Sequence, residues 1–222
     1  MTMLRAILQS VALYIDIGNV RTIKIMAGLM GPSLLLQLIT FTTPGWRVYK
    51  NTEEGKVEYM ALMYDVRCDE KGCKTYPVSE DEYKKEWQFH YITWIIKGLV
   101  PILLCSVSLC LLLFSIRKPK WREPFFFFST WSLGIATVLQ WDLMASFADI
   151  HRMVLAHGLL RSENPVPWNV ILHAISAFLT TTVMLVSLLI LMKKLILNVM
   201  ADDKMEEPLL TNLDDFQAQS HI

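Results

Sequence analysis

The chain has 222 residues, of which 53% are hydrophobic, and its mean hydropathy is +0.36. Soluble domains of this size rarely carry so much apolar content. Acidic and basic residues balance at 21 each, which argues against a nucleic-acid-binding protein, because such proteins present an excess of Lys and Arg. The charges cluster between four long apolar runs, and this pattern is typical of a protein that crosses a membrane several times.

Residues 1–22 precede the first apolar run and predict an amphipathic N-terminal helix. Its apolar side chains recur at three- and four-residue spacing, as in Leu4, Leu8 and Val11. It can lie in the membrane interface on the cytoplasmic side, it can extend the first span, or it can pack on the cytoplasmic ends of the other helices.

Four runs are long and apolar enough to cross a bilayer core of roughly 30 Å, which takes about 20 helical residues. We expect transmembrane helices over residues 23–43, 92–116, 124–148 and 165–193. Proline lies near the start of the third and fourth runs, where its missing N–H costs a helix little. The sequence therefore predicts an all-α membrane bundle of four transmembrane helices.

Three groups of basic residues flank these runs and set the predicted orientation. They comprise Arg21 and Lys24, the loop at residues 117–123, and Lys193 with Lys194. Under the positive-inside rule all three groups are cytoplasmic. Residues 44–91 and 149–164 are then extracellular loops, and residues 194–222 form a cytoplasmic tail. The expected location is the plasma membrane, with both termini inside the cell.

The long polar loop at residues 44–91 predicts a small extracellular antiparallel β-sheet. Its candidate strands alternate in polarity and cover residues 47–50, 56–60, 61–67 and 74–78. Pro77 favours an edge position for the last strand, since proline has no N–H to donate to a neighbour. Cys68 and Cys73 can form a disulfide if this loop faces an oxidising compartment.

Lys97 and Asp142 are charges expected inside the second and third spans, at similar depth near the extracellular ends. Charged side chains are costly in a bilayer, so these two either pair with each other or each extend to water. A pair could be structural or could belong to an ion pathway.

The chain ends in Ser220-His221-Ile222. A hydroxyl residue third from the end and an apolar last residue match a ligand of a PDZ domain, which binds such a terminus as an added strand. Matches this short also arise by chance. A cytoplasmic PDZ scaffold is therefore one candidate partner.

The predicted topology, with a long first outer loop and a short second one, resembles the claudin and peripheral-myelin-protein superfamily. Trp46 matches the family's tryptophan early in the first loop, and Cys68 and Cys73 match its cysteine pair. The stretch Thr43-Pro-Gly-Trp also resembles the nematode claudin-like branch. Residues 63–67 read Met-Tyr-Asp-Val-Arg and lack the family's Gly-Leu-Trp. The resemblance implies a claudin-like scaffold with a divergent outer surface.

The resemblance implies a protein that acts in cell junctions or adhesion through protein contacts of its extracellular sheet. The alternative is an auxiliary subunit that regulates the trafficking or gating of an ion channel or receptor, which the missing Gly-Leu-Trp favours slightly. The expected partners are the lipid bilayer and other membrane proteins. No nucleophile with a base and no metal-ligand spacing stands out, so we expect no enzyme, no metal and no cofactor.

Overall fold

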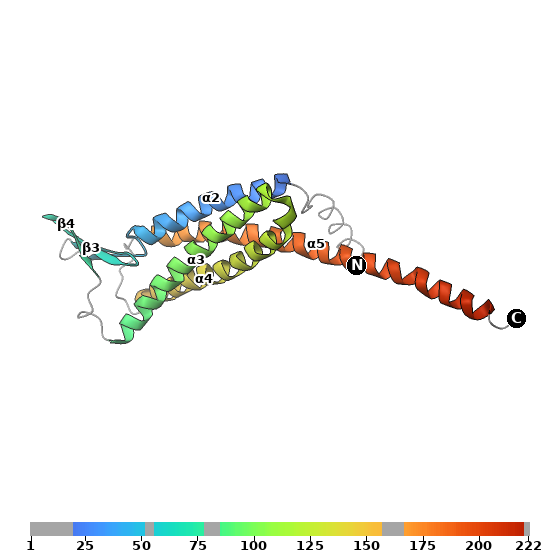
Figure 1. The fold of residues 1–222 in the computed structure, drawn as a ribbon. Coiled ribbons are helices and arrows are strands. Elements are labelled where there is room, and N and C mark those ends of the chain that lie inside the picture. The colour runs from blue at the N-terminus through green and yellow to red at the C-terminus, as the bar shows by residue number, and fades with distance from the viewer. Residues whose placement is uncertain (1–19, 52–55, 78–84, 157–166, 220–222) are drawn as a thin grey trace, which may run out of the picture.

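The structure is a computed structural model, and it describes residues 20–51, 56–77, 85–156 and 167–219. In chain order the elements are α2 (Val20–Thr42), β1 (Arg47–Asn51), β2 (Lys56–Met60), β3 (Tyr64–Asp69), β4 (Gly72–Pro77), α3 (Lys85–Arg117), the 3-10 helix η1 (Pro119–Trp121), α4 (Arg122–Ala156) and α5 (Trp168–Gln219). Figure 1 shows the helices gathered into an elongated bundle with the strands at one end. Most of the predicted N-terminal helix, residues 1–19, lies outside the described residues.

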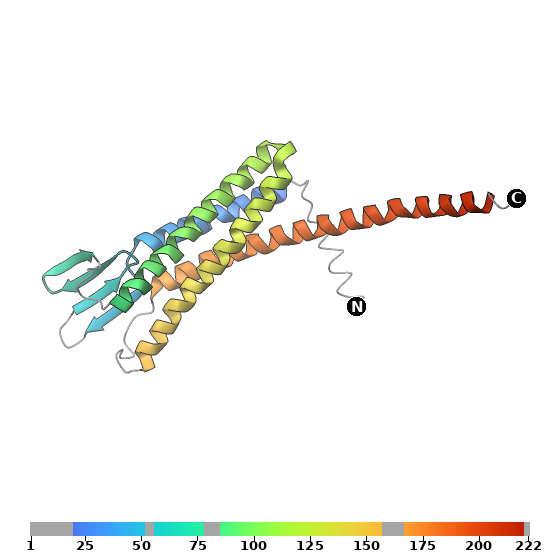
Figure 2. The same ribbon diagram turned by 60° about the horizontal axis from the view of Figure 1, so that its bottom comes forward.

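The four long helices form an up-and-down bundle in which each helix packs on two neighbours. α2 and α4 each pack against both α3 and α5. Both views show the helices side by side, with α5 continuing past the bundle as a single helix (Figures 1 and 2). The short η1 turn leaves α3 and α4 antiparallel, because a link of few residues allows the chain little except reversal.

Three of the described helical segments are long and apolar enough to cross a membrane: Val20–Thr42, Ile92–Arg117 and Trp168–Asn198. α4 is not among them, so the predicted span at residues 124–148 is not shown, although α4 packs in the bundle like the others. Polar side chains such as Gln140 and Asp142 interrupt its apolar run and lower its hydropathy.

The helices are longer than the apolar runs that predicted them. The start of α3 takes in residues 85–91, which were expected to be loop, and the end of α4 enters the predicted loop at 149–164. α4 begins at Arg122, which shortens the predicted loop at 117–123, and α5 runs into the predicted tail at 194–222. Hydropathy marks the apolar part of a helix, whereas backbone hydrogen bonding continues into polar turns.

The bundle holds hydroxyl side chains within its apolar core, and its outer surface is also apolar. Ser33 of α2 lies 2.9 Å from Ser176 and 2.8 Å from Thr180 of α5, measured between hydroxyl oxygens. The hydroxyls of Ser108 and Ser129 join α3 to α4 at 2.6 Å. Exposed apolar side chains on the helices include Ile25, Leu35, Leu103, Leu113, Phe128, Val138, Phe178 and Leu185. Small hydroxyl residues between helices and an apolar exterior are typical of a bundle that faces lipid.

Figure 1 shows that the start of α2 and the α3–α4 turn lie at the end of the bundle opposite the sheet, which we call the basic end because basic residues are frequent in these segments and in the adjoining part of α5. It holds Arg21, Lys24, Arg117, Lys118, Lys120, Arg122, Lys193 and Lys194. An ion pair between Lys194 and Glu123 joins α5 to the first turn of α4 there. The other end, where α2 leads into the strands, is the sheet end.

The strands form one antiparallel sheet in the order β1-β2-β3-β4, which confirms the predicted small antiparallel sheet. Each strand pairs with the next one in the chain, as expected for strands joined by tight turns. β4 is an edge strand and carries Pro77, as predicted. The register places Cys68 of β3 directly opposite Cys73 of β4.

Candidate functional site

The β3–β4 hairpin is closed by a disulfide between Cys68 and Cys73, which confirms the predicted pair. The turn between them pairs Asp69 with Gly72, and the backbone N–H of Lys71 donates to the Asp69 carboxylate at 2.8 Å. Gly72 has a φ of +126°, a conformation that L side chains rarely adopt. The disulfide and the turn at Gly72 therefore both restrain the geometry of the hairpin.

One face of the sheet is charged. Glu58, Arg67 and Lys74 lie side by side in one row across β2, β3 and β4. The Arg67 guanidinium lies 3.4 Å from the Glu58 carboxylate and 5.2 Å from the centroid of the Tyr76 ring. We call this side the charged face.

The opposite face is less polar. It carries Val57 beside Cys68, and the next row holds Tyr59, Val66 and Thr75. Val57, Tyr59 and Val66 are half-buried, and Thr75 is exposed. The described strands make their main contacts with one another rather than with a helix. We call this side the apolar face, and its outer rows remain accessible to a partner.

Trp46 fixes the base of the sheet to the bundle. Its indole is 1% exposed, and its N–H donates to the Thr40 carbonyl of α2 at 2.7 Å. Its ring lies 4.7 Å from the ring of Phe147 in α4 and 5.1 Å from that of His173 in α5, between centroids. The buried set formed by Trp46, Leu62, Trp94, Leu143 and Phe147 is named the anchor cluster. It joins the strands to α3 and α4.

Gly45 and the first residues of α5 also hold the junction between the sheet and the bundle. Gly45 has a φ of +143°, and a Cβ atom built there would lie 2.3 Å from the Trp168 ring. The side-chain amide of Asn169 donates to the carbonyls of Thr40 and Thr43 at 3.2 and 2.7 Å. These bonds satisfy carbonyls that the end of α2 would otherwise leave without partners.

The link between β2 and β3 completes the attachment. The Tyr64 hydroxyl donates to the Thr42 carbonyl at 2.7 Å, and Ala61 N–H donates to the Tyr64 carbonyl at 2.8 Å. Leu62, 1% exposed, lies against Gly98 of α3. The sheet is thus held at its base by several elements, while its far end projects from the bundle (Figure 2).

Lys97 and Asp142 are brought together on the flank of the bundle near the sheet end. The Lys97 Nζ lies 2.7 Å from the Asp142 carboxylate, linking α3 to α4. The Lys97 side chain is 22% exposed and that of Asp142 is 52% exposed. The pair lies at the surface of the bundle. An ion pathway would instead need a row of ionisable side chains along the interior of the bundle.

The last group of predicted site residues is the candidate PDZ ligand at the C-terminus. Ser220, His221 and Ile222 lie outside the described residues, so the PDZ match stays a prediction. Within the described part of the chain, no three His, Cys, Asp or Glu side chains are grouped so that they could hold a metal ion.

Comparison with protein-family models finds no family that matches this chain, and comparison with curated proteins finds no relative. The claudin-like resemblance therefore stays a prediction from topology, Trp46 and the cysteine pair.

Sequence reasoning singled out Trp46 as a motif residue but missed the site that it occupies. Phe147, Trp168 and Asn169 fall within the predicted spans at residues 124–148 and 165–193, and no role at the sheet was predicted for them. Pro44-Gly45 was the available signal, because a proline–glycine pair between a helix and a strand marks a tight turn. Nothing local to the sequence indicates that this turn lies beneath a helix that starts more than a hundred residues later.

Proposed function

We propose that this chain is a claudin-like, four-span protein of the plasma membrane that acts through protein–protein contacts of its extracellular sheet, in cell adhesion or cell junctions. The observation that carries this proposal is the firmly seated sheet with an accessible apolar face. Buried contacts hold its base, whereas Val57, Tyr59 and Val66 are only half-buried. A sheet usually buries one face against another layer, so an apolar face that is only partly buried suits a second protein.

The four-span arrangement is supported by the position of α4. This helix packs between α3 and α5 and extends from the basic end to the sheet end. A helix that packs along two membrane-capable neighbours, α3 and α5, meets the same surroundings as they do. Its polar Ser129 and Gln140 side chains are buried, so they do not face lipid.

The orientation is supported by charge and by the disulfide. The basic end gathers eight Lys and Arg side chains and, among the described residues up to Asn198, the one acid Glu123, which favours the cytoplasmic side. The sheet at the other end carries the Cys68–Cys73 bond, which persists in an oxidising compartment such as the cell exterior. Both arguments give the same orientation independently.

The proposed mechanism is recognition by a surface of fixed direction. Because Trp46 and its neighbours attach the base of the sheet to α2, α3 and α4, the apolar face keeps one angle to the membrane. A pre-formed surface loses little conformational freedom on binding, so modest contacts are enough for association. The partner is a second copy of this chain, on the same cell or on the facing one.

Substitutions of neighbouring residues on β4 test this proposal. Thr75→Glu adds a charge to the apolar face, and Lys74→Glu changes charge on the opposite face of the same strand. Cells that express the protein should aggregate and enrich it at their contacts. Thr75→Glu should reduce both by several-fold, whereas Lys74→Glu should leave them near the wild-type level. Absence of aggregation and of contact enrichment in the wild type would count against an adhesive role.

A second candidate, an auxiliary subunit of a channel or receptor, is favoured by the Lys97–Asp142 pair. A half-exposed carboxylate on the flank of a membrane bundle is costly against lipid and would be covered by a partner helix. Purification from native membrane separates the two candidates. A large channel polypeptide in stoichiometric amount, lost in Asp142→Asn, supports the auxiliary role, and copies of this chain alone support adhesion.

A further inference from the structure

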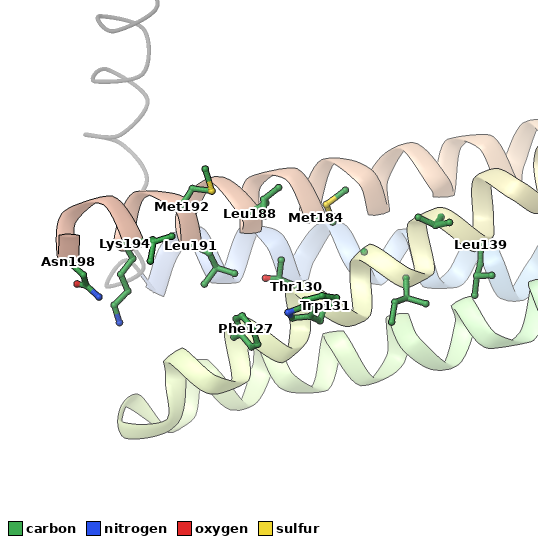
Figure 3. Close-up of a pocket in the computed structure, with 14 residues that line it drawn as sticks. Phe127, Thr130, Trp131, Leu139, Met184, Leu188, Leu191, Met192, Lys194 and Asn198 are labelled. Atoms are coloured by element: carbon green, nitrogen blue, oxygen red, sulfur yellow. The ribbon is translucent and has the colours of Figure 1, made fainter. Parts of the chain in front are cut away.

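An apolar groove of about 810 Å³ runs between α4 and α5 on the outer surface of the bundle (Figure 3). Its walls include Trp131, Ile135 and Val138 from α4, and Met184, Leu188 and Leu191 from α5. This volume is within the range of cavities that bind a small molecule. Side chains of neighbouring helices usually fill the space between them, so an open groove at this place needs an explanation.

The groove is polar at one end. Lys194 and Asn198 extend from α5 there, and Figure 3 shows them together at the end of the row of apolar side chains. A smaller cavity of about 340 Å³ adjoins this end and shares Phe127, Leu191 and Lys194 with the groove. The shape is thus a long apolar channel that opens into a compact space beside a lysine.

The groove opens at the basic end of the bundle. This end holds eight Lys and Arg residues and, among the described residues up to Asn198, the one acid Glu123, while Asp202 and Asp203 follow about one turn further along α5. Glu123 is paired with Lys194. A negatively charged group placed beside Lys194 and Asn198 would therefore be attracted by most of its surroundings.

The space at the centre of the groove is left by a glycine. Gly134 lines it, and a Cβ atom at this position would meet nothing within 4 Å. A helix interior favours almost any other residue over glycine, by up to about 1 kcal/mol against alanine in water. Because Gly134 has no side chain, it leaves space in the groove for a bound molecule.

We propose that this groove binds an anionic glycerophospholipid of the cytoplasmic leaflet. An acyl chain occupies the apolar channel, and the phosphate accepts hydrogen bonds from the Lys194 ammonium and the Asn198 amide. Basic pockets between helices on the cytoplasmic side suit such head groups, because each nearby Lys or Arg adds attraction to an anionic lipid. The inference rests on the proposed four-span topology, since both helices must cross the bilayer.

Trp131 is a built-in reporter of the groove, because it lines the channel and is 61% exposed. The full-length protein is reconstituted into vesicles with a small fraction of lipid brominated on its acyl chains, either phosphatidylserine or phosphatidylcholine. The Trp131 signal is the fluorescence difference between wild type and Trp131→Phe. We expect brominated phosphatidylserine to quench this signal at about one-fifth of the concentration that phosphatidylcholine requires.

Two variants test the two halves of the proposed site. Lys194→Gln removes the charge at the opening, and Gly134→Phe fills the channel from a position where a side chain fits. Each should reduce the preference for phosphatidylserine to near one. Lys120→Gln is the matched control, because it removes a cation of the basic end that does not line the groove, and it should keep the preference.

Equal quenching by the two lipids in the wild type would show a bulk lipid layer and overturn the proposal. Loss of the preference in Lys120→Gln as well would also overturn it, because general attraction to the basic end would then explain the result. Absence of quenching by either lipid would also overturn the proposal, because no lipid chain would then lie beside Trp131. Labelling of Asp149→Cys, described below, reports separately whether α4 crosses the bilayer, so failure of the groove and failure of the topology are distinguishable.

Discussion

Gly45 is the residue on which the junction between sheet and bundle depends most directly. Its φ of +143° is unfavourable for any residue with a Cβ, and the Trp168 ring occupies the place where that Cβ would lie. Neighbouring hydrogen bonds fix the same backbone, since the N–H groups of Gly45 and Trp46 both donate to the Met60 carbonyl at 3.0 Å. A substitution of Gly45 by a residue with a Cβ therefore adds both backbone strain and a clash with the Trp168 ring.

We predict that Gly45→Ala destabilises the protein by about 3 kcal/mol or more, from backbone strain of about 1–3 kcal/mol and overpacking of similar size. Thermal unfolding in detergent, followed by tryptophan fluorescence, measures the change. Gly72→Ala is the matched control, because its φ is +126° but its Cβ would meet nothing within 4 Å. It should show the strain without the clash. Equal effects of the two substitutions would mean that Trp168 does not pack against Gly45.

The β3–β4 hairpin is an element whose stability is largely its own. Its disulfide, its turn and the pairing of the two strands are local, whereas the contacts with the helices lie at the base of the sheet. Closing so short a loop restricts the unfolded chain less than closing a long one, so the bond stabilises by about 2 kcal/mol or less. Its main effect is to hold the geometry of the projecting end.

We expect replacement of both Cys68 and Cys73 by Ser to loosen the hairpin and leave the bundle intact. Hydrogen exchange should become faster over residues 64–77 by at least several-fold, because local opening no longer works against a covalent link. Exchange in α2 and α4 serves as the internal control and should not change. Faster exchange throughout the helices would contradict the separation of the two parts.

At the scale of the whole molecule, the number of membrane crossings decides how every surface is used. Three helical segments among the described residues are apolar enough to span, and the crossing of α4 is a proposal. If α4 crosses, the sheet and the far end of α4 share one side of the membrane, and the α3–α4 turn lies on the other. If it does not cross, α5 begins on the side of the α3–α4 turn, and its far end with Lys193 and Lys194 lies on the side of the sheet.

Single cysteines test this arrangement in a Cys110→Ser background, since Cys105 is buried. A thiol reagent that cannot pass the membrane should label Met63→Cys and Asp149→Cys on intact cells. Lys120→Cys in the α3–α4 turn should react only after the cells are made permeable. All three positions are exposed, so differences in labelling report the side of the membrane. Labelling of Asp149→Cys only after permeabilisation would rule out the fourth span.

The amino-acid sequence by itself determined the parts that depend on local pattern. Apolar runs located the helices, alternation located the strands, and Pro77 identified an edge strand. Cys68 and Cys73 could be paired because they are close in the chain and lie in a polar segment. The helices extend beyond these apolar runs, since hydropathy does not mark where a polar turn stops being helical.

Only the tertiary structure decided which distant residues meet. Trp46 was visible as a motif, but its contacts with Phe147 and His173 join segments more than a hundred residues apart. The groove between α4 and α5 likewise depends on how two helices pack, and no periodicity in either helix encodes it alone. Such contacts follow from the summed packing of several elements, whereas hydropathy and alternation report the preference of each element by itself.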